Sequence, residues 1–160
     1  MDFGSIEDIE QQGFSGFVAV SFLRESACRQ VPEVPGVYLV IRPQPQPPIF
    51  LGHSTGGHFK KREPTVPIQE LQQAWVTGSI VIYIGKATML RKRLHSYMRF
   101  GYGEPVPHHG GRYIWQLADA ANLLVCWKAT PDKDPRQIEC WLIQGFRARY
   151  GKRPFANLSD

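Results

Sequence analysis

The sequence predicts a single α+β domain, and three observations support that class. Short apolar segments at residues 36–42, 80–84 and 123–129 have the composition of β-strands. Longer segments at 89–100 and 135–150 repeat apolar residues at helical spacing. The chain has 160 residues, of which 42% are hydrophobic and 21% charged, and this suits one domain with its own core.

An N-terminal extension, residues 1–34, precedes the first predicted strand. Residues 1–15 have no clear pattern and are expected to be loosely ordered. Residues 22–29 predict a short helix, which Pro32 and Pro35 stop.

A proline- and glycine-rich insert of about residues 43–79 separates the first two strands. Residues 43–48 contain four prolines, which cannot donate to a sheet, and therefore form a loop. Residues 50–66 are expected to be irregular because of their glycines. Residues 67–75 predict a helix with Pro67 near its first position.

The helix expected at about residues 89–100 is amphipathic. Thr88 is its candidate N-cap. Leu90, Leu94 and Tyr97 follow at i, i+4 and i+7, so they share the face that packs on the core.

The cations of this helix divide between its edge and its outer face. Arg93 precedes Tyr97 by four residues, so it points beside the core. Lys92, His95 and Arg99 are expected to face outward.

The helix expected at residues 135–150 begins after Asp134, its candidate N-cap, and ends at Gly151. Glu139 falls beside Phe146 on the edge of the apolar stripe, away from the polar face. The four tryptophans are expected in the core: Trp75, Trp115, Trp127 and Trp141.

Positive charge is unevenly distributed along the chain. The formal net charge is +5 and the pI is about 9.3. Residues 86–99 and the C-terminal segment are basic, whereas residues 1–33 lean acidic. Two basic clusters favour a polyanionic partner, and the alternative is an ordinary solvated basic face. The candidate nucleic-acid contacts are Arg91, Lys92, His95, Arg99 and Arg112.

The remaining composition argues against several classes of protein. The three cysteines form no CxxC pair, which argues against a disulfide framework and a structural zinc site. No apolar run approaches the ~20 residues that span a bilayer, so no membrane association is expected. The N-terminus lacks a basic leader, and the expected location is cytoplasmic.

Two tyrosine segments carry the most specific signal. Gly36-Val37-Tyr38 is followed by Tyr83-Ile84-Gly85-Lys86, then by Arg93, a helical Glu139 and a late Asn157. This ordered set resembles the GIY-YIG nuclease superfamily. The segment 81–97 is especially similar to the nuclease domain of the bacterial nucleotide-excision-repair incision subunit. The resemblance covers roughly residues 35–42 and 80–158, and it implies a small three-stranded, mainly antiparallel sheet flanked by helices.

The resemblance also implies a role for each matching residue. Tyr38 lines the site, and Tyr83 activates the attacking water, alone or through Lys86. Arg93 binds the scissile phosphate. Tyr97 stands where family members carry histidine or tyrosine. Glu139 is the single carboxylate ligand of a divalent metal, Mg²⁺ or Mn²⁺, and Asn157 braces the site.

The residues taken alone allow simpler readings. Tyr38 and Tyr83 suit any strand, and Arg93 suits a surface ion pair. Glu139 suits the first turn of any helix, and Asn157 could be a chain-end residue without a role. The spacing also departs from the family, because 44 residues separate the two tyrosines where a hairpin is usual.

These features together predict a divalent-metal-dependent DNA endonuclease, acting in repair or restriction. The alternative is a catalytically silent nucleic-acid-binding domain of the same fold. RNA remains a third possibility, since phosphate contacts do not identify the sugar. A single site cuts one strand, so clean double-strand breaks would indicate a homodimer.

Overall fold

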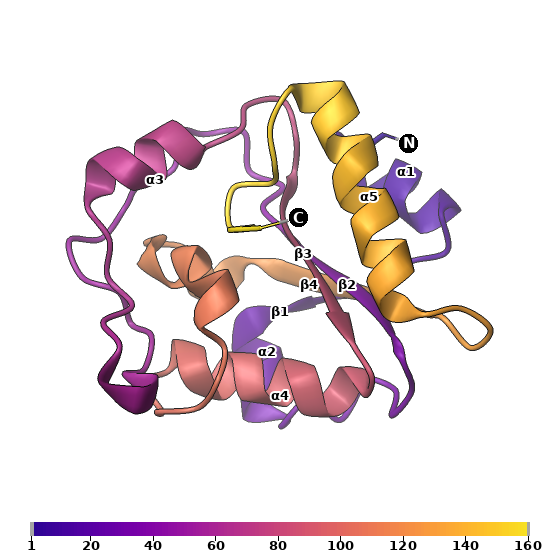
Figure 1. Cartoon of the computed structure of the whole chain (residues 1–160), viewed down its shortest axis with the longest axis horizontal. Coiled ribbons are helices and arrows are strands. Elements are labelled where there is room, and N and C mark those ends of the chain that lie inside the picture. The colour runs from indigo at the N-terminus through magenta and orange to yellow at the C-terminus, as the bar shows by residue number, and fades with distance from the viewer. Residues whose placement is uncertain (1, 160) are drawn as a thin grey trace.

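The computed structural model describes residues 2–159, which form an α+β fold with a four-stranded antiparallel sheet (Figure 1). The strand order is β1-β4-β2-β3. The strands are β1 (Ser15–Ala19), β2 (Gly36–Ile41), β3 (Val81–Ala87) and β4 (Leu124–Ala129). The α-helices are α1 (Ile6–Gln11), α2 (Val20–Glu25), α3 (Ile68–Ala74), α4 (Leu90–Gly101) and α5 (Pro135–Tyr150). Three 3₁₀ segments complete the fold: η1 (Phe59–Lys61), η2 (His109–Gln116) and η3 (Ala120–Asn122).

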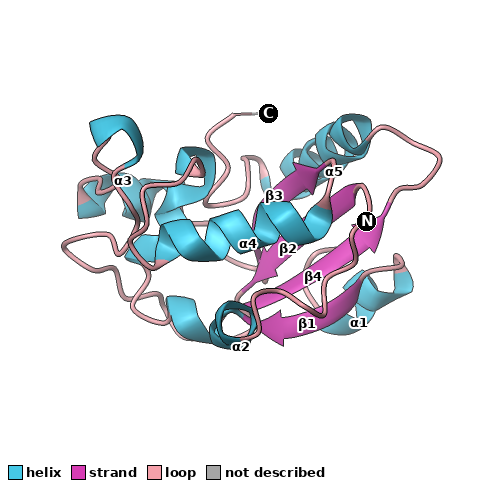
Figure 2. Ribbon diagram, turned by 90° about the horizontal axis from the view of Figure 1, so that it is seen from below, coloured by secondary structure: helices cyan, strands magenta, loops and turns pink. Residues whose placement is uncertain are grey.

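Helices cover both faces of the sheet. Figure 2 shows α2 and α4 on one side of the strands and α1 and α5 on the other. The central strand β2 explains this arrangement, because its side chains alternate between the faces. Val37 and Leu39 belong to the core beneath α5, whereas Tyr38 and Val40 belong to the core beneath α4. All six residues of β2 are buried, as expected for a strand covered on both sides.

The two tyrosine segments pair directly despite their separation in sequence. β2 and β3 are antiparallel neighbours, and Tyr38 lies opposite Gly85. The insert leaves the sheet after β2 and returns at β3, and it includes the predicted helix as α3. The insert is anchored by Phe50, which stacks on Phe155 at 5.8 Å between ring centroids. The two strands therefore pair although 44 residues separate their tyrosines, and the insert packs beside the sheet.

The prediction of three strands was wrong by one. The additional strand, β1, forms an edge of the sheet and pairs with β4. Its pattern is hidden because Gly16 and Phe17 have positive φ and the register shifts between Gly16 and Val18. A β-bulge of this kind breaks the alternation by which strands are recognised.

The prediction that residues 1–15 are loosely ordered was also wrong. They contain α1, whose N-cap Ser5 accepts a hydrogen bond from the backbone N–H of Asp8. Phe3, Ile9 and Phe14 are all buried in the core beneath α5. Phe3 packs edge-on against Phe146, with ring centroids 5.2 Å apart. These apolar contacts hold the N-terminal segment in place.

The prediction for the start of α4 needs correction. Thr88 is not the N-cap of α4, which begins at Leu90 after Met89 without a side-chain cap. The backbone N–H groups of Leu90 and Arg91 donate to the carbonyls of Val34 and Pro32, so the segment that precedes β2 satisfies the helix terminus.

The expectation for the tryptophans holds for two of the four. Trp115 and Trp127 are buried and Trp75 is partly buried, but Trp141 is 64% exposed. Trp141 lies on α5 outside the stripe formed by Leu142 and Phe146, which are buried. Within residues 2–159, no helix is long and apolar enough to cross a membrane.

A candidate active site at the edge of the sheet

The glycine of the second tyrosine segment allows close contact between β2 and β3. Gly85 lies beneath the ring of Tyr38, its cross-strand partner. A Cβ atom at residue 85 would stand 2.3 Å from Cζ of Tyr38, closer than real Cβ contacts. Any larger residue would displace the Tyr38 ring, so the two tyrosine segments form one packed unit.

Three tyrosines from three elements meet beside this glycine. Tyr38 comes from β2, Tyr83 from β3 and Tyr97 from α4. Their ring centroids are 5.6–6.4 Å apart, within the range of favourable aromatic contacts. Tyr38 and Tyr97 are fully buried, and Tyr83 is 8% exposed. Tyr83 is thus the least buried member of the cluster.

His108 completes the cluster, although it was not among the predicted site residues. Its ring stacks on Tyr97 with 3.6 Å between centroids and 10° between planes. Its Nε2 lies 3.4 Å from the hydroxyl of Tyr38. The side chain is only 1% exposed, and its Nδ1 has no hydrogen-bond partner among the described residues. The hydroxyl of Tyr97 donates to the carbonyl of Gly111 at 2.6 Å, which fixes the same loop.

Arg93 lies at the edge of the tyrosine cluster, as its helical position predicts. Its Nη1 donates to the carbonyl of Pro107 at 3.2 Å, next to His108. Its positive charge lowers the pKa of Tyr38, Tyr83 and Tyr97 and also that of His108. The guanidinium therefore acts electrostatically on every member of the cluster.

Burial outweighs these cationic effects, and all three tyrosines have raised pKa values. Desolvation raises the pKa of Tyr38 and Tyr97 well above 10. The pKa of Tyr83 is also raised, first by desolvation and then by the negative charge of Glu139, while Arg93 and a hydrogen bond with Tyr38 oppose the shift. The positive charge of Arg93 therefore only moderates the rise in the pKa of Tyr83.

Lys86 and Glu139 form an ion pair across the sheet edge. Lys86 Nζ lies 2.9 Å from a carboxylate oxygen of Glu139, and so joins β3 to the first half of α5. The Glu139 side chain is only 14% exposed, whereas that of Lys86 is 45% exposed. Glu139 is thus largely shielded from solvent beside the apolar stripe of α5, as its position in the sequence predicted.

A cleft of about 390 Å³ opens where β3, α4 and α5 meet. Lys86 and Arg93 both line it, together with Asp134 and Arg136 from the start of α5. Arg136, which is exposed, was not among the predicted site residues. Three cations facing one cleft make a suitable place for a phosphate group.

Asn157 braces the edge strand from the other side. Its Oδ1 accepts from the backbone N–H of Ile84, and its Nδ2 donates to the carbonyl of the same residue, both at 2.9 Å. The N–H of Ala156 donates to the carbonyl of Ile82. The C-terminal segment thus continues the hydrogen bonding of β3 next to Tyr83.

The predicted nucleic-acid contacts lie in different environments. Lys92 and His95 are exposed on α4, as expected. Arg91 pairs with Glu33 at 2.6 Å, and Arg99 pairs with Glu104 at 3.0 Å.

Arg112 belongs to η2 and is half-buried. Its Nη1 donates to the carbonyl of His109 at 3.2 Å. The His-Gly-Gly-Arg segment therefore begins a 3₁₀ helix.

The donor set at Glu139 is small for a metal site. In the described part of the chain, no three His, Cys, Asp or Glu side chains cluster closely enough to hold a metal ion. One sheltered carboxylate still suits Mg²⁺, which keeps several waters and takes phosphate oxygens as ligands. Binding there would require Lys86 to share or release the carboxylate, because the two groups are in contact.

Comparison of the chain with protein-family models, with curated proteins and with solved structures found no match. Any functional assignment therefore depends on the sequence pattern and on the geometry of the site.

Proposed function

We propose that this chain is a divalent-metal-dependent DNA endonuclease of the GIY-YIG type, which hydrolyses phosphodiester bonds. The observation that carries the proposal is the convergence of the predicted residues. Tyr38, Tyr83, Arg93 and Tyr97 share one cluster, and the charge of Glu139 acts on Tyr83. Lys86 pairs with Glu139 and lines one cleft together with Arg93. The fold thus brings residues as far apart in sequence as 38 and 139 to the same edge of the sheet.

Each side chain has a role that its environment supports. Arg93 and Lys86 line the cleft, where they would bind the scissile phosphate and offset the charge that grows on it. Tyr83 is the least buried of the three tyrosines, and its hydroxyl would orient the attacking water. Tyr38 and Tyr97 are fully buried, so they would position Tyr83 without touching substrate.

Glu139 would hold the metal together with a substrate phosphate oxygen. A bound Mg²⁺ or Mn²⁺ supplies Lewis-acid stabilisation of the phosphate. Glu139 also acts on Tyr83 directly, because its negative charge raises the pKa of that phenol. Neutralising this charge would make the phenolate easier to form. Metal binding at Glu139 would therefore favour formation of the Tyr83 phenolate.

The alternative function is a catalytically silent nucleic-acid-binding domain. The Lys86–Glu139 ion pair and the raised pKa of Tyr83 favour it, because both describe a resting state without an activated nucleophile. Both functions predict salt-sensitive DNA binding, so binding alone does not separate them.

Cleavage of a panel of DNA forms separates the two functions. The panel contains supercoiled, nicked, branched and single-stranded DNA, each incubated with Mg²⁺, Mn²⁺ or EDTA. We expect metal-dependent cleavage of at least one DNA form, and a lower cleavage rate in the Tyr83→Phe variant. The matched control is Tyr102→Phe, which alters an exposed tyrosine at the end of α4 and keeps the wild-type rate. Folded protein that binds DNA but cleaves none of these forms would refute the endonuclease.

A further inference from the structure

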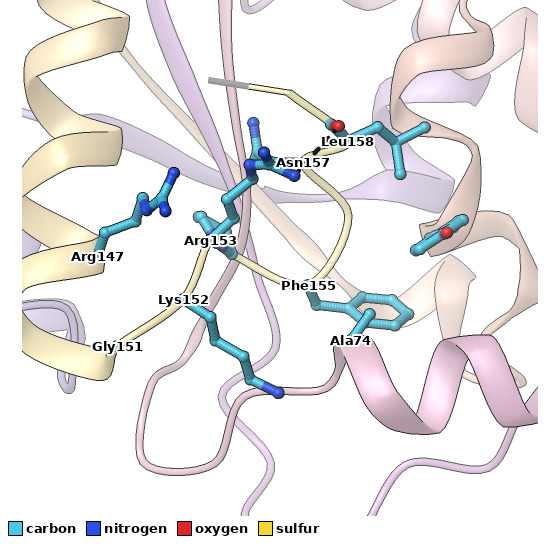
Figure 3. Close-up of a pocket in the computed structure, with 10 residues that line it drawn as sticks. Ala74, Arg147, Gly151, Lys152, Arg153, Phe155, Asn157 and Leu158 are labelled. Atoms are coloured by element: carbon cyan, nitrogen blue, oxygen red, sulfur yellow. Dashed lines mark hydrogen bonds between the residues drawn. The ribbon is translucent and has the colours of Figure 1, made fainter.

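A second cleft, of about 430 Å³, lies further along the same edge of the sheet (Figure 3). It is formed by the end of α5, the C-terminal segment 151–158 and the end of α3. Backbone and side-chain hydrogen bonds from Ala156 and Asn157 to β3 fix the C-terminal segment beside Ile82 and Ile84. This second cleft is therefore built on the strand that carries Tyr83.

Three cations line one side of the second cleft. Figure 3 shows Arg147 reaching from α5 toward Arg153, while Lys152 extends from the C-terminal segment. Lys152 Nζ donates to the carbonyl of Gln73 at 2.9 Å, which orients the ammonium group without cancelling its charge. Arg153 Nη1 donates to the carbonyl of Leu158 at 3.3 Å. None of the described residues that line this cleft is acidic.

The opposite wall is apolar and rigid. Phe155 and Tyr113 pack with their ring centroids 5.7 Å apart, and both are buried. Tyr113 is held in turn by a hydrogen bond from its hydroxyl to Glu70 at 2.7 Å. A cleft with cations on one side and a fixed aromatic wall on the other suits an anion such as phosphate carried on a larger group.

The helix α5 gives the spacing between the two clefts. Arg136 lines the first cleft and Arg147 lines the second. They are eleven residues apart on α5, which corresponds to roughly 16 Å along the helix axis at 1.5 Å per residue. One strand of B-DNA advances about 3.4 Å per nucleotide along its axis. A strand that runs along α5 would therefore place about five nucleotides between the two clefts.

We propose that the second cleft binds a backbone phosphate of the nucleic-acid strand, about five nucleotides from the phosphate held by Arg93 and Lys86. This inference depends on the proposed function for the identity of the strand. It adds a second anchoring point, which would set the orientation of the strand across the sheet edge. A free phosphate or nucleotide has the same chemistry and is distinguished below.

The test measures DNA affinity against salt concentration without requiring cleavage. Fluorescence anisotropy of a labelled duplex in EDTA gives the dependence of log affinity on log salt. The variant Arg147→Gln/Lys152→Gln should lower that slope by about 0.9, as expected for one lost phosphate contact. Between 50 and 200 mM salt, the wild type should then lose roughly 3.5-fold more affinity than the variant.

The matched control removes the same charge outside the second cleft. Arg149→Gln/Lys133→Gln alters one exposed arginine on α5 and one exposed lysine before it, and neither lines this cleft. The control should keep the wild-type slope. Lys152→Gln alone provides a milder variant if the double substitution lowers the thermal unfolding temperature.

The outcomes separate this proposal from the proposed function. Equal slopes for the cleft variant and the control would overturn the second anchoring point, whether or not the protein cleaves DNA. A lower slope in the cleft variant would support it even if no cleavage occurred. Amide chemical shifts of residues 151–158 under titration with inorganic phosphate or a mononucleotide test the other source. Tight binding of either ligand, with no change in the DNA slope, would also overturn the proposal.

Discussion

His108 should make the stability of the protein depend on pH in a measurable way. Burial lowers the pKa of His108 well below 6.5, and the charge of Arg93 lowers it further. The groups that face it are Tyr38 from β2, Tyr83 from β3 and Tyr97 with Arg93 from α4, and none supplies a negative charge at neutral pH. The folded protein therefore keeps this imidazole neutral, while the unfolded chain protonates it near pH 6.5.

The sign and size of the effect follow from this difference. Below pH 6.5 the unfolded state binds one more proton, so the free energy of unfolding falls as the pH falls. The contribution of His108 is fully present above pH 6.5 and is lost toward its lower folded pKa. For one proton, the loss is about 1 kcal/mol between pH 6.5 and 5.5, and about 1.4 kcal/mol for each further unit.

Urea denaturation from pH 7.5 to 5.0 measures this effect in wild type and His108→Gln. The variant should be less stable at pH 7.5, because it loses the stacking on Tyr97, but its stability should fall less steeply toward pH 5. His53→Gln alters an exposed histidine and serves as the control that keeps the wild-type curve. Parallel curves for wild type and His108→Gln would refute the view that this imidazole is neutral and shielded.

Three further substitutions test the packing around the site. Gly85→Ala places a Cβ against the Tyr38 ring and should lower the free energy of unfolding by about 1–3 kcal/mol in urea titrations. An unchanged midpoint would contradict the close contact. Asn157→Ala removes both hydrogen bonds to Ile84, and a loss of about 1–3 kcal/mol in the same assay is expected. Trp141→Gln should change stability by less than about 0.5 kcal/mol, because that ring is exposed, and a larger loss would show that it packs.

The sequence was most informative where a local pattern coincided with burial. The strand at β2, the strand at β3 and the helices α4 and α5 were all predicted near their observed bounds. The position of Glu139 beside the apolar stripe of α5 followed from helical periodicity alone, and its side chain is 14% exposed.

The sequence was least informative where tertiary contacts decide the structure. α1 has only six residues, and it is held by the burial of Phe3, Ile9 and Phe14. β1 is recognisable only through its pairing with β4, since a bulge interrupts its pattern. Short elements of this kind gain their stability from packing, which single-sequence patterns do not display.

The candidate site likewise contains residues that the sequence predicted and one that it did not. Tyr83, Arg93 and Glu139 were identified from their order in the chain, whereas His108 was not. Its loop lies between α4 and η2, with no periodicity that marks it as buried. A His-His-Gly-Gly sequence is compatible with a surface turn, and only the stacking on Tyr97 shows its place in the tyrosine cluster.

Nicking of supercoiled plasmid by wild type and Glu139→Gln, with Mg²⁺, Mn²⁺ or EDTA, tests the central claim most directly. Glu104→Gln is the control. It removes an exposed carboxylate that pairs with Arg99 and does not line the cleft of Lys86 and Arg93. The proposed function predicts nicking by wild type and Glu104→Gln with either metal, none with EDTA, and none by Glu139→Gln under any condition. Nicking by Glu139→Gln at the wild-type rate would contradict the assignment of this carboxylate as the metal ligand and, with it, the proposed site.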